Sequence, residues 1–167
     1  MKNREYFKLI DFFSLFYFKY LRAQTGSDPH FWTNYLSDPA HRIWCGYAFE
    51  RLCMAHISQI KQKLGISGVI TETYAFRSRL QKGGAQIGLV IDRKDDTINL
   101  CECKYFGKPY ELTENDIAGF ERKKEVFLME TGTKKSIHKT MITANGLIQN
   151  PYRNEIQSEI VLNDLFI

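Results

Sequence analysis

The segment GGAQIGLVIDRKDDTINLCECKY, Gly83 to Tyr105, decides the fold class that the sequence predicts. It contains two apolar runs, Ala85 to Asp92 and Thr97 to Tyr105, which are rich in residues that favour strands. A short polar stretch, Lys94 to Asp96, separates them. This pattern predicts a β-hairpin with a tight turn.

A register for the hairpin follows from the alternation of side chains between the two faces of a strand. We expect Asp92 to pair with Ile98, which places Gly88 opposite Glu102. One face then carries Gln86, Gly88, Glu102 and Lys104. The other face is expected to fill the core with Ile87, Leu89 and Ile91.

The Glu102 and Lys104 pair on one strand face has two interpretations. In the first, it belongs to an exposed sheet face with an ion pair worth less than about 1 kcal/mol. In the second, it belongs to a divalent-metal site, where carboxylate oxygens hold a hard cation and a lysine stabilises the attacking water or the developing phosphate charge.

The rest of the chain supplies the other elements of an α/β domain. Apolar residues at three- and four-residue spacing predict a helix from Ile43 to Leu64, and Thr113 with Asp116 predicts the capped start of another that runs to about Glu130. Further strands are expected at Val69 to Phe76, Ser136 to Ala144 and Ile160 to Leu162. The predicted fold is a mixed sheet of four or five strands flanked by helices.

The N-terminal region is expected to form a separate part, residues 1–42, before the main domain at 43–167. Leu9 to Leu21 predicts a helix that is apolar nearly all round. It is too short to span a membrane, which needs about 20 apolar residues. Either the domain's own core covers this helix, or a partner outside this chain does, which predicts self-association through the helix. Ala23 to Arg42 is the candidate linker.

Composition narrows the function classes. The 167 residues suit one main globular domain, and the net charge of +4 is compatible with phosphate contacts without requiring them. The four cysteines lack zinc-knuckle spacing and are expected to be reduced thiols of a cytoplasmic protein. The chain has no Walker-type phosphate loop, so nucleotide hydrolysis is not expected from it.

Three segments carry a family resemblance: WCGYAFERLCMAHISQIKQKLGI, GGAQIGLVIDR and INLCECKY. Together they resemble the PD-(D/E)XK nuclease-like domain at the C-terminus of archaeal-type AAA+ ATPases, over nearly the whole chain. The segment DFFSLFYFKYL is similar to the part that follows the winged helix in those proteins. The resemblance implies an upstream ATPase and winged-helix domain as partners, with residues 1–42 as a remnant after them.

The resemblance also implies a restriction-endonuclease-like core and assigns roles to the site. Glu50 matches the helix glutamate that orients the groups around the metal, and Gln86 matches the glutamine before the family's aspartate. Glu102 matches the metal-binding glutamate, and Lys104 the lysine that stabilises the nucleophile or transition state. The implied reaction is hydrolysis of DNA phosphodiesters with Mg²⁺ or Mn²⁺.

Gly88 stands where the family has an aspartate, so metal is expected to bind weakly or not at all. Neither other carboxylate replaces it easily: Asp92 lies about 13 Å along the strand, and Glu72 needs a suitable register. Gly88 reflects either an inactivating substitution or the decay of catalysis in a domain kept for binding. The predicted function is an impaired nuclease; the alternative is a non-catalytic DNA- or protein-interaction module of the parent ATPase.

Basic residues form three groups that predict contacts with a DNA backbone. The alternative is that each group is an ordinary solvated face. The first two groups are Arg77, Arg79 and Lys82 before the hairpin, and Arg122, Lys123 and Lys124 on the second helix. The third comprises Lys134, Lys135 and Lys139.

Overall fold

The computed structural model describes residues 11–22, 26, 28–36, 38–80 and 82–166. Its centre is a five-stranded sheet in the order β1-β2-β3-β4-β5. The first three strands are antiparallel, whereas β4 runs parallel to both β3 and β5. The strands are β1 Thr71–Arg77, β2 Gln86–Arg93, β3 Thr97–Lys104, β4 Ser136–Thr143 and β5 Ser158–Val161. The predicted mixed sheet is confirmed.

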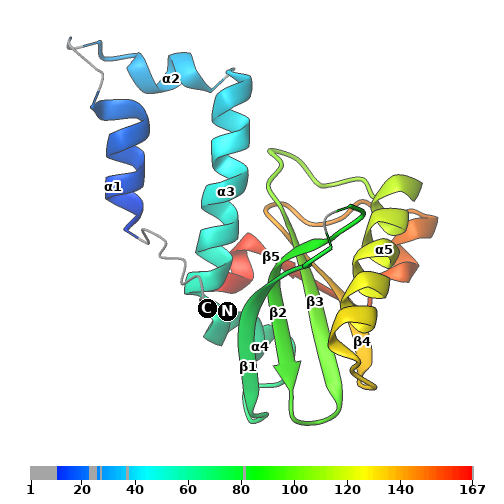
Figure 1. Ribbon diagram of the computed structural model, residues 1–167. Helices are drawn as coiled ribbons and strands as arrows, with labels where there is room; N and C mark the ends of the chain where they lie inside the picture. The colour runs from blue at the N-terminus through cyan, green and yellow to red at the C-terminus, as the bar shows by residue number, and fades with distance from the viewer. Residues whose placement is uncertain (1–10, 23–25, 27, 37, 81, 167) are drawn as a thin grey trace.

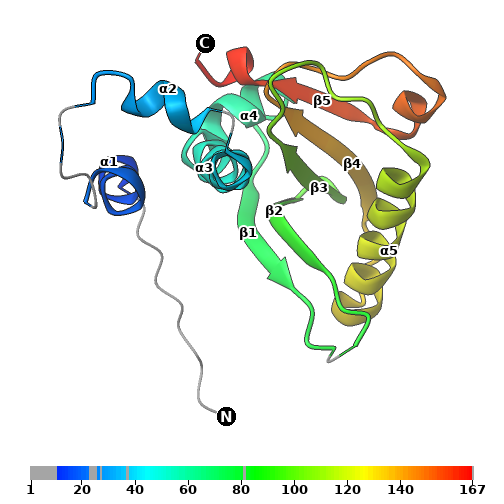
Figure 2. The ribbon, with the colours of Figure 1, turned by 90° about the horizontal axis from the view of Figure 1, so that it is seen from above.

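Helices cover both faces of the sheet (Figures 1 and 2). One face is covered by α3 Pro39–Ala55 and α4 Ile57–Lys63, and the 3₁₀ turn η3 Leu162–Phe166 packs against α4. The other face is covered by α5 Glu114–Thr131, beside the 3₁₀ turn η2 Pro151–Glu155. The domain is therefore a three-layer arrangement of helix, sheet and helix.

Two apolar clusters fill the spaces between these layers. Leu89 and Ile91 of β2 pack with Phe49 on the α3 side, whereas Val90 packs with Phe127 on the α5 side. These strand residues are 2% exposed or less. A strand buried on both faces requires a continuous apolar run, which explains the sequence of β2.

The helix α5 has the ends that its sequence predicts. The Thr113 hydroxyl accepts a hydrogen bond from the Asp116 amide, and the Asp116 carboxylate accepts one from the Thr113 amide. This capping box satisfies two amides that the first helical turn leaves unpaired. Gly132 ends the helix in the left-handed region, at φ 65°. Both predicted boundaries are confirmed.

The helix predicted from Ile43 to Leu64 is wrong in two respects. It begins earlier, at Pro39, because the Asp38 carboxylate caps the Ala40 amide. It also breaks at His56, whose backbone leaves the helical region at φ −114° and ψ 35°. The His56 Nδ1–H donates to the carbonyl of Leu52 at 2.8 Å, as expected of a satisfied structural histidine. The helix α3 crosses the boundary predicted between residues 42 and 43.

An N-terminal lobe, residues 11–36 as far as they are described, lies on the side of α3 away from the sheet (Figure 1). It contains α1 Phe12–Phe16, the π-helical turn η1 Tyr17–Leu21 and α2 Phe31–Tyr35. The Tyr20 hydroxyl lies 3.1 Å from His41 Nδ1, and its ring lies 5.2 Å from the Trp44 ring. Aromatic contacts thus hold the lobe to α3. Leu9 and Ile10 of the predicted helix lie outside the described residues.

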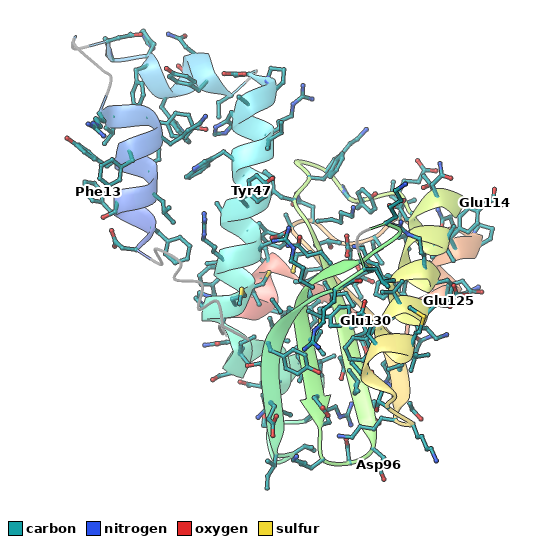
Figure 3. All side chains as sticks on the ribbon, in the orientation of Figure 1. Phe13, Tyr47, Asp96, Glu114, Glu125 and Glu130 are labelled. Atoms are coloured by element: carbon teal, nitrogen blue, oxygen red, sulfur yellow. The ribbon has the colours of Figure 1, made fainter. Side chains whose placement is uncertain are left out.

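The outer side of α1 and η1 leaves large aromatic residues uncovered. Phe13 is 68% exposed and Phe18 is 59% exposed, and Figure 3 shows Phe13 on the side of α1 that faces away from α3. The described part of this segment is therefore only partly covered by the chain itself. Within the described residues, no helix combines the length and apolar character needed to cross a membrane.

Candidate functional site

The β2–β3 hairpin has a closed end and an open end. At the closed end, residues 91–99, Asp92 pairs with Ile98 as predicted. The register continues to the pair Leu89 and Cys101, beyond which β2 and β3 no longer pair with each other. The open end comprises residues 86–89 and 101–104, and it carries the candidate site residues of both strands.

A β-bulge interrupts β2 at the open end. The register between β1 and β2 shifts between Tyr74 and Phe76, so a single residue of β1 opposes both Gly88 and Leu89. Bulges bend a strand and redirect its side chains, and glycine is common at them. Gly88 thus lies in a β-bulge, which the sequence pattern did not predict.

The bulge reverses the alternation of side chains along β2. Ile87 packs in the cluster on the α5 side, whereas Leu89 and Ile91 pack in the cluster on the α3 side. The prediction that these three residues fill one face is therefore wrong. The extra residue at the bulge breaks the two-residue period on which that prediction depended.

A cavity of about 130 Å³ lies at the open end, where α3, β2, β3 and α5 meet. Its lining includes Glu50, Gln86, Gly88, Glu102 and Lys123. A Cβ atom added to Gly88 would lie 3.9 Å from the carboxylate of Glu50. The structure thus brings together four of the five candidate catalytic and metal positions from separate elements. The fifth, Lys104, lines an adjacent hollow instead.

Glu50 occupies the mouth of this cavity. The residue as a whole is exposed. Its carboxylate nevertheless borders the cavity beside Gly88.

Two lysines surround the carboxylate of Glu102. Lys123 Nζ donates to Glu102 Oε2 at 2.5 Å, and Lys104 Nζ lies 3.6 Å from Glu102 Oε1. The Lys104 ammonium also lies 6.0 Å from the centre of the Tyr110 ring. All three charged side chains are partly buried, between 23% and 33% exposed. Such pairs are screened by salt less than fully exposed ones.

Lys123 was expected only to contact a DNA backbone from the surface of α5, yet it belongs to this cavity. The spacing of Lys123 from neighbouring apolar residues could have predicted that it faces the sheet. Phe120 lies three residues before it and Phe127 four residues after it, and both are buried against the sheet. That spacing places Lys123 on the sheet-facing side of the helix.

The residues present do not fit the Mg²⁺ or Mn²⁺ ion that the family resemblance implies. Glu50 and Glu102 are the only carboxylates among the described residues that line the cavity. Mg²⁺ demands near-octahedral oxygen coordination, and Glu102 is already held by two ammonium groups. Across the described ranges, no three His, Cys, Asp or Glu side chains form a metal-binding group.

Neither alternative carboxylate reaches Gly88. Asp92 accepts a hydrogen bond from Lys135 at the closed end. Glu72 pairs with Asp92 across β1 and β2 and lies 3.4 Å from Lys94. The β1–β2 register therefore places Glu72 four residues from Gly88, which corresponds to about 13 Å along a strand. The register that Glu72 would need is absent from the described sheet.

Two cysteines, Cys101 and Cys103, line the cavity. All four cysteines of the chain are free, as expected. Burial raises the pKa of Cys101, and a hydrogen bond with Cys53, together with burial, raises the pKa of Cys103. Buried thiols with raised pKa values are less reactive than exposed thiols.

The basic residues divide into exposed and engaged groups. Arg77, Arg79, Lys82 and Arg122 are exposed. By contrast, Lys139 is only 5% exposed and donates to Glu121 and Glu155, so the expectation that it belongs to a phosphate-binding surface is wrong. The engaged group also includes Lys124 with Glu121, and Lys135 with Asp92. Phosphate contacts by the exposed residues stay predictions.

Comparisons with protein-family models, with curated proteins and with solved structures find no match to this chain. The functional argument therefore depends on the geometry of the open end. That geometry consists of three carboxylates, two ammonium groups and two glycines around two hollows that share Glu102 and Lys123.

Proposed function

We propose that this chain is a PD-(D/E)XK nuclease-like domain that binds nucleic acid at the open end of its hairpin, with metal-dependent hydrolysis impaired by Gly88. One observation carries this proposal: Glu50, Gly88 and Glu102 border a single cavity although they come from three elements. The order of elements along the chain also supports it. A helix is followed by three antiparallel strands, a second helix and a strand parallel to β3.

The two lysines supply the phosphate-binding chemistry of this proposal. Glu102 holds the ammonium groups of Lys104 and Lys123 in place, at 3.6 Å and 2.5 Å. Ammonium groups bind phosphate oxygens as point charges. The exposed Arg77 and Arg79 near the start of β2 add positive charge for the rest of a nucleic-acid backbone. Binding is then expected to weaken steeply with salt.

A cleavage and binding assay on linear and supercoiled DNA at low salt, with Mg²⁺ or Mn²⁺, tests the proposal. The unaltered chain should bind DNA and cut it poorly. Gly88→Asp should restore metal-dependent cleavage, because the added carboxylate would lie beside Glu50. The double variant Gly88→Asp with Lys104→Ala should lose that cleavage while still binding DNA.

Two results would contradict parts of this proposal. If Gly88→Asp binds metal but cuts nothing, the enzyme assignment fails and a binding module remains. If the unaltered chain already cuts as well as Gly88→Asp, then the limiting defect does not lie at residue 88. Circular dichroism of each variant serves as the control for folding.

A second candidate function is a protein-interaction module, and the exposed aromatic side of α1 and η1 favours it. Phe12, Phe13, Tyr17 and Phe18 are 42% to 68% exposed. Large exposed apolar patches mark interaction sites in many proteins. Self-association, or contact with the ATPase and winged-helix partners that the resemblance implies, would cover them. Sedimentation of the chain against Phe13→Ser tests this candidate, and a monomer at all concentrations would contradict self-association.

A further inference from the structure

A second hollow lies beside the first, between α5 and the sheet. Its volume is about 150 Å³, and it shares Glu102 and Lys123 with the cavity that contains Gly88. Its floor is apolar and consists of Leu112, Phe120, Met141 and Ile156. Its charged lining consists of Lys104 and Lys123 together with the carboxylates of Glu102, which pairs with both lysines, and Asp116. An apolar pocket with cationic groups beside it suits a ligand with a flat apolar body and an anionic end.

The helix leaves this space open at a glycine. Gly119 lines the hollow in the second turn of α5, where glycine is unfavourable compared with alanine. A Cβ added at Gly119 would meet no atom within 4 Å. No neighbouring group therefore forces a glycine at this position, and its absent side chain enlarges the hollow.

Asn115 provides an amide beside the same hollow. Within the described part of the chain, its side chain makes no hydrogen bond, and the residue is exposed. An amide group can donate and accept at once, so it can contact the edge of a base. The neighbouring Asp116 has no such freedom, because its carboxylate accepts hydrogen bonds from Thr113 and Tyr110.

We propose that this hollow binds one unpaired nucleobase of the nucleic acid whose phosphate lies at Lys104 and Lys123. This inference rests on the proposed function and specifies its substrate as a single strand or an unpaired end. The ring would contact the Phe120 side of the floor, with its edge toward Asn115. A base inside a pocket between helix and sheet cannot stay paired, because its pairing edge is occupied by protein.

Fluorescence anisotropy at low salt, without divalent ions, tests the inference. The probes are a labelled twelve-nucleotide thymidine strand, an abasic strand of the same length, and a duplex. The unaltered chain should bind the thymidine strand about fivefold or more tightly than the abasic strand, since stacking of one base contributes at least that factor. It should bind the duplex more weakly than the thymidine strand.

Two variants locate the effect. Gly119→Leu fills the hollow and should remove the preference for bases while retaining abasic binding. The matched control, Ala118→Leu, adds the same side chain at an exposed position of the same helix and should keep the preference. Asn115→Ala should reduce the preference in part, and it decides the question if Gly119→Leu fails to fold.

Equal binding of the thymidine and abasic strands by the unaltered chain would overturn the base pocket. The proposed function would survive that result if Lys123→Ala weakened both strands equally. If none of the three probes binds, both the base pocket and the nucleic-acid function fail. Metal binding by Gly88→Asp is a separate readout, so it distinguishes the failure of the metal site from the failure of the pocket.

Discussion

The two ends of the β2–β3 hairpin are built from the same strands, but strand pairing is regular at one end and interrupted at the other. At the closed end, the Asp92–Ile98 pair is regular, and Lys135 donates both to Asp92 and to the Arg93 carbonyl. The turn beyond it contains Asp96, labelled in Figure 3. At the open end, the bulge at Gly88 interrupts β2 and two hollows lie beside Glu102.

This difference indicates that the closed end of the hairpin contributes mainly to stability and the open end mainly to binding. At the closed end, strand pairing is regular and apolar side chains such as Ile98 pack between the sheet and α5. The bulge and the end of strand pairing create room at the open end, and charged residues from α3, β3 and α5 converge there. Substitutions at the closed end should therefore change stability, whereas substitutions at the open end should change binding.

The largest expected effect on stability is at the closed end. Ile98 is 1% exposed in the cluster between the sheet and α5. Ile98→Ala should lower the free energy of unfolding by about 2–5 kcal/mol, because it leaves a cavity. Urea denaturation measures this loss. The control at the open end is Gln86→Ala, which should change stability by less than about 0.5 kcal/mol because Gln86 is exposed.

A matched pair of lysines sharpens the comparison. Lys123→Ala at the open end should weaken DNA binding and reduce the slope of log affinity against log salt by about 1. Lys135→Ala at the closed end removes an ammonium of similar exposure and should leave that slope unchanged. Its effect should instead be a loss of unfolding free energy, because the hydrogen bonds to Asp92 and to the Arg93 carbonyl are removed. Equal salt slopes for the two variants would break the comparison.

The capping box of α5 makes a smaller, pH-dependent contribution beside the open end. Burial alone would raise the pKa of Asp116, but hydrogen bonds from Thr113 and Tyr110 bring it below its ordinary value. A lowered pKa gives stability that is complete above the unfolded value, about 3.9, and lost as the pH falls through the folded value.

Asp116→Asn tests this contribution. It should destabilise the chain by about 1 kcal/mol near neutral pH. The difference from the unaltered chain should shrink as the pH falls below about 4. Chemical denaturation at several pH values measures it. A difference that grows on acidification would contradict the assigned direction of the pKa shift.

A small effect on stability, neutral or stabilising, is expected for Gly88→Ala. The Gly88 backbone lies outside the left-handed region, and an added Cβ would meet Glu50 at an ordinary contact distance of 3.9 Å. The change should therefore be neutral or stabilise the chain by up to about 1 kcal/mol, mainly by restricting the unfolded state. Gly132→Ala is the contrasting control, because φ 65° there disfavours alanine. A large loss in Gly88→Ala would show that the bulge requires glycine.

Local patterns predicted much of the fold, because their determinants are close in the chain. The hairpin register follows from a short turn, and the start of α5 follows from Thr113 and Asp116 three residues apart. The bulge at Gly88 depends instead on pairing with β1, which no pattern within β2 records. The family resemblance indicated Glu50 and Glu102, but the contribution of Lys123 arises only when α5 packs on the sheet.

Calorimetric titration of Mn²⁺ into Gly88→Asp tests the central claim most directly, namely that Glu50, position 88 and Glu102 form one site. We predict weak or no binding by the unaltered chain and by the uncharged control Gly88→Asn, and binding by Gly88→Asp that is lost on adding Glu102→Gln. Binding by Gly88→Asn equal to that of Gly88→Asp, or binding that persists without the Glu102 carboxylate, would contradict the claim.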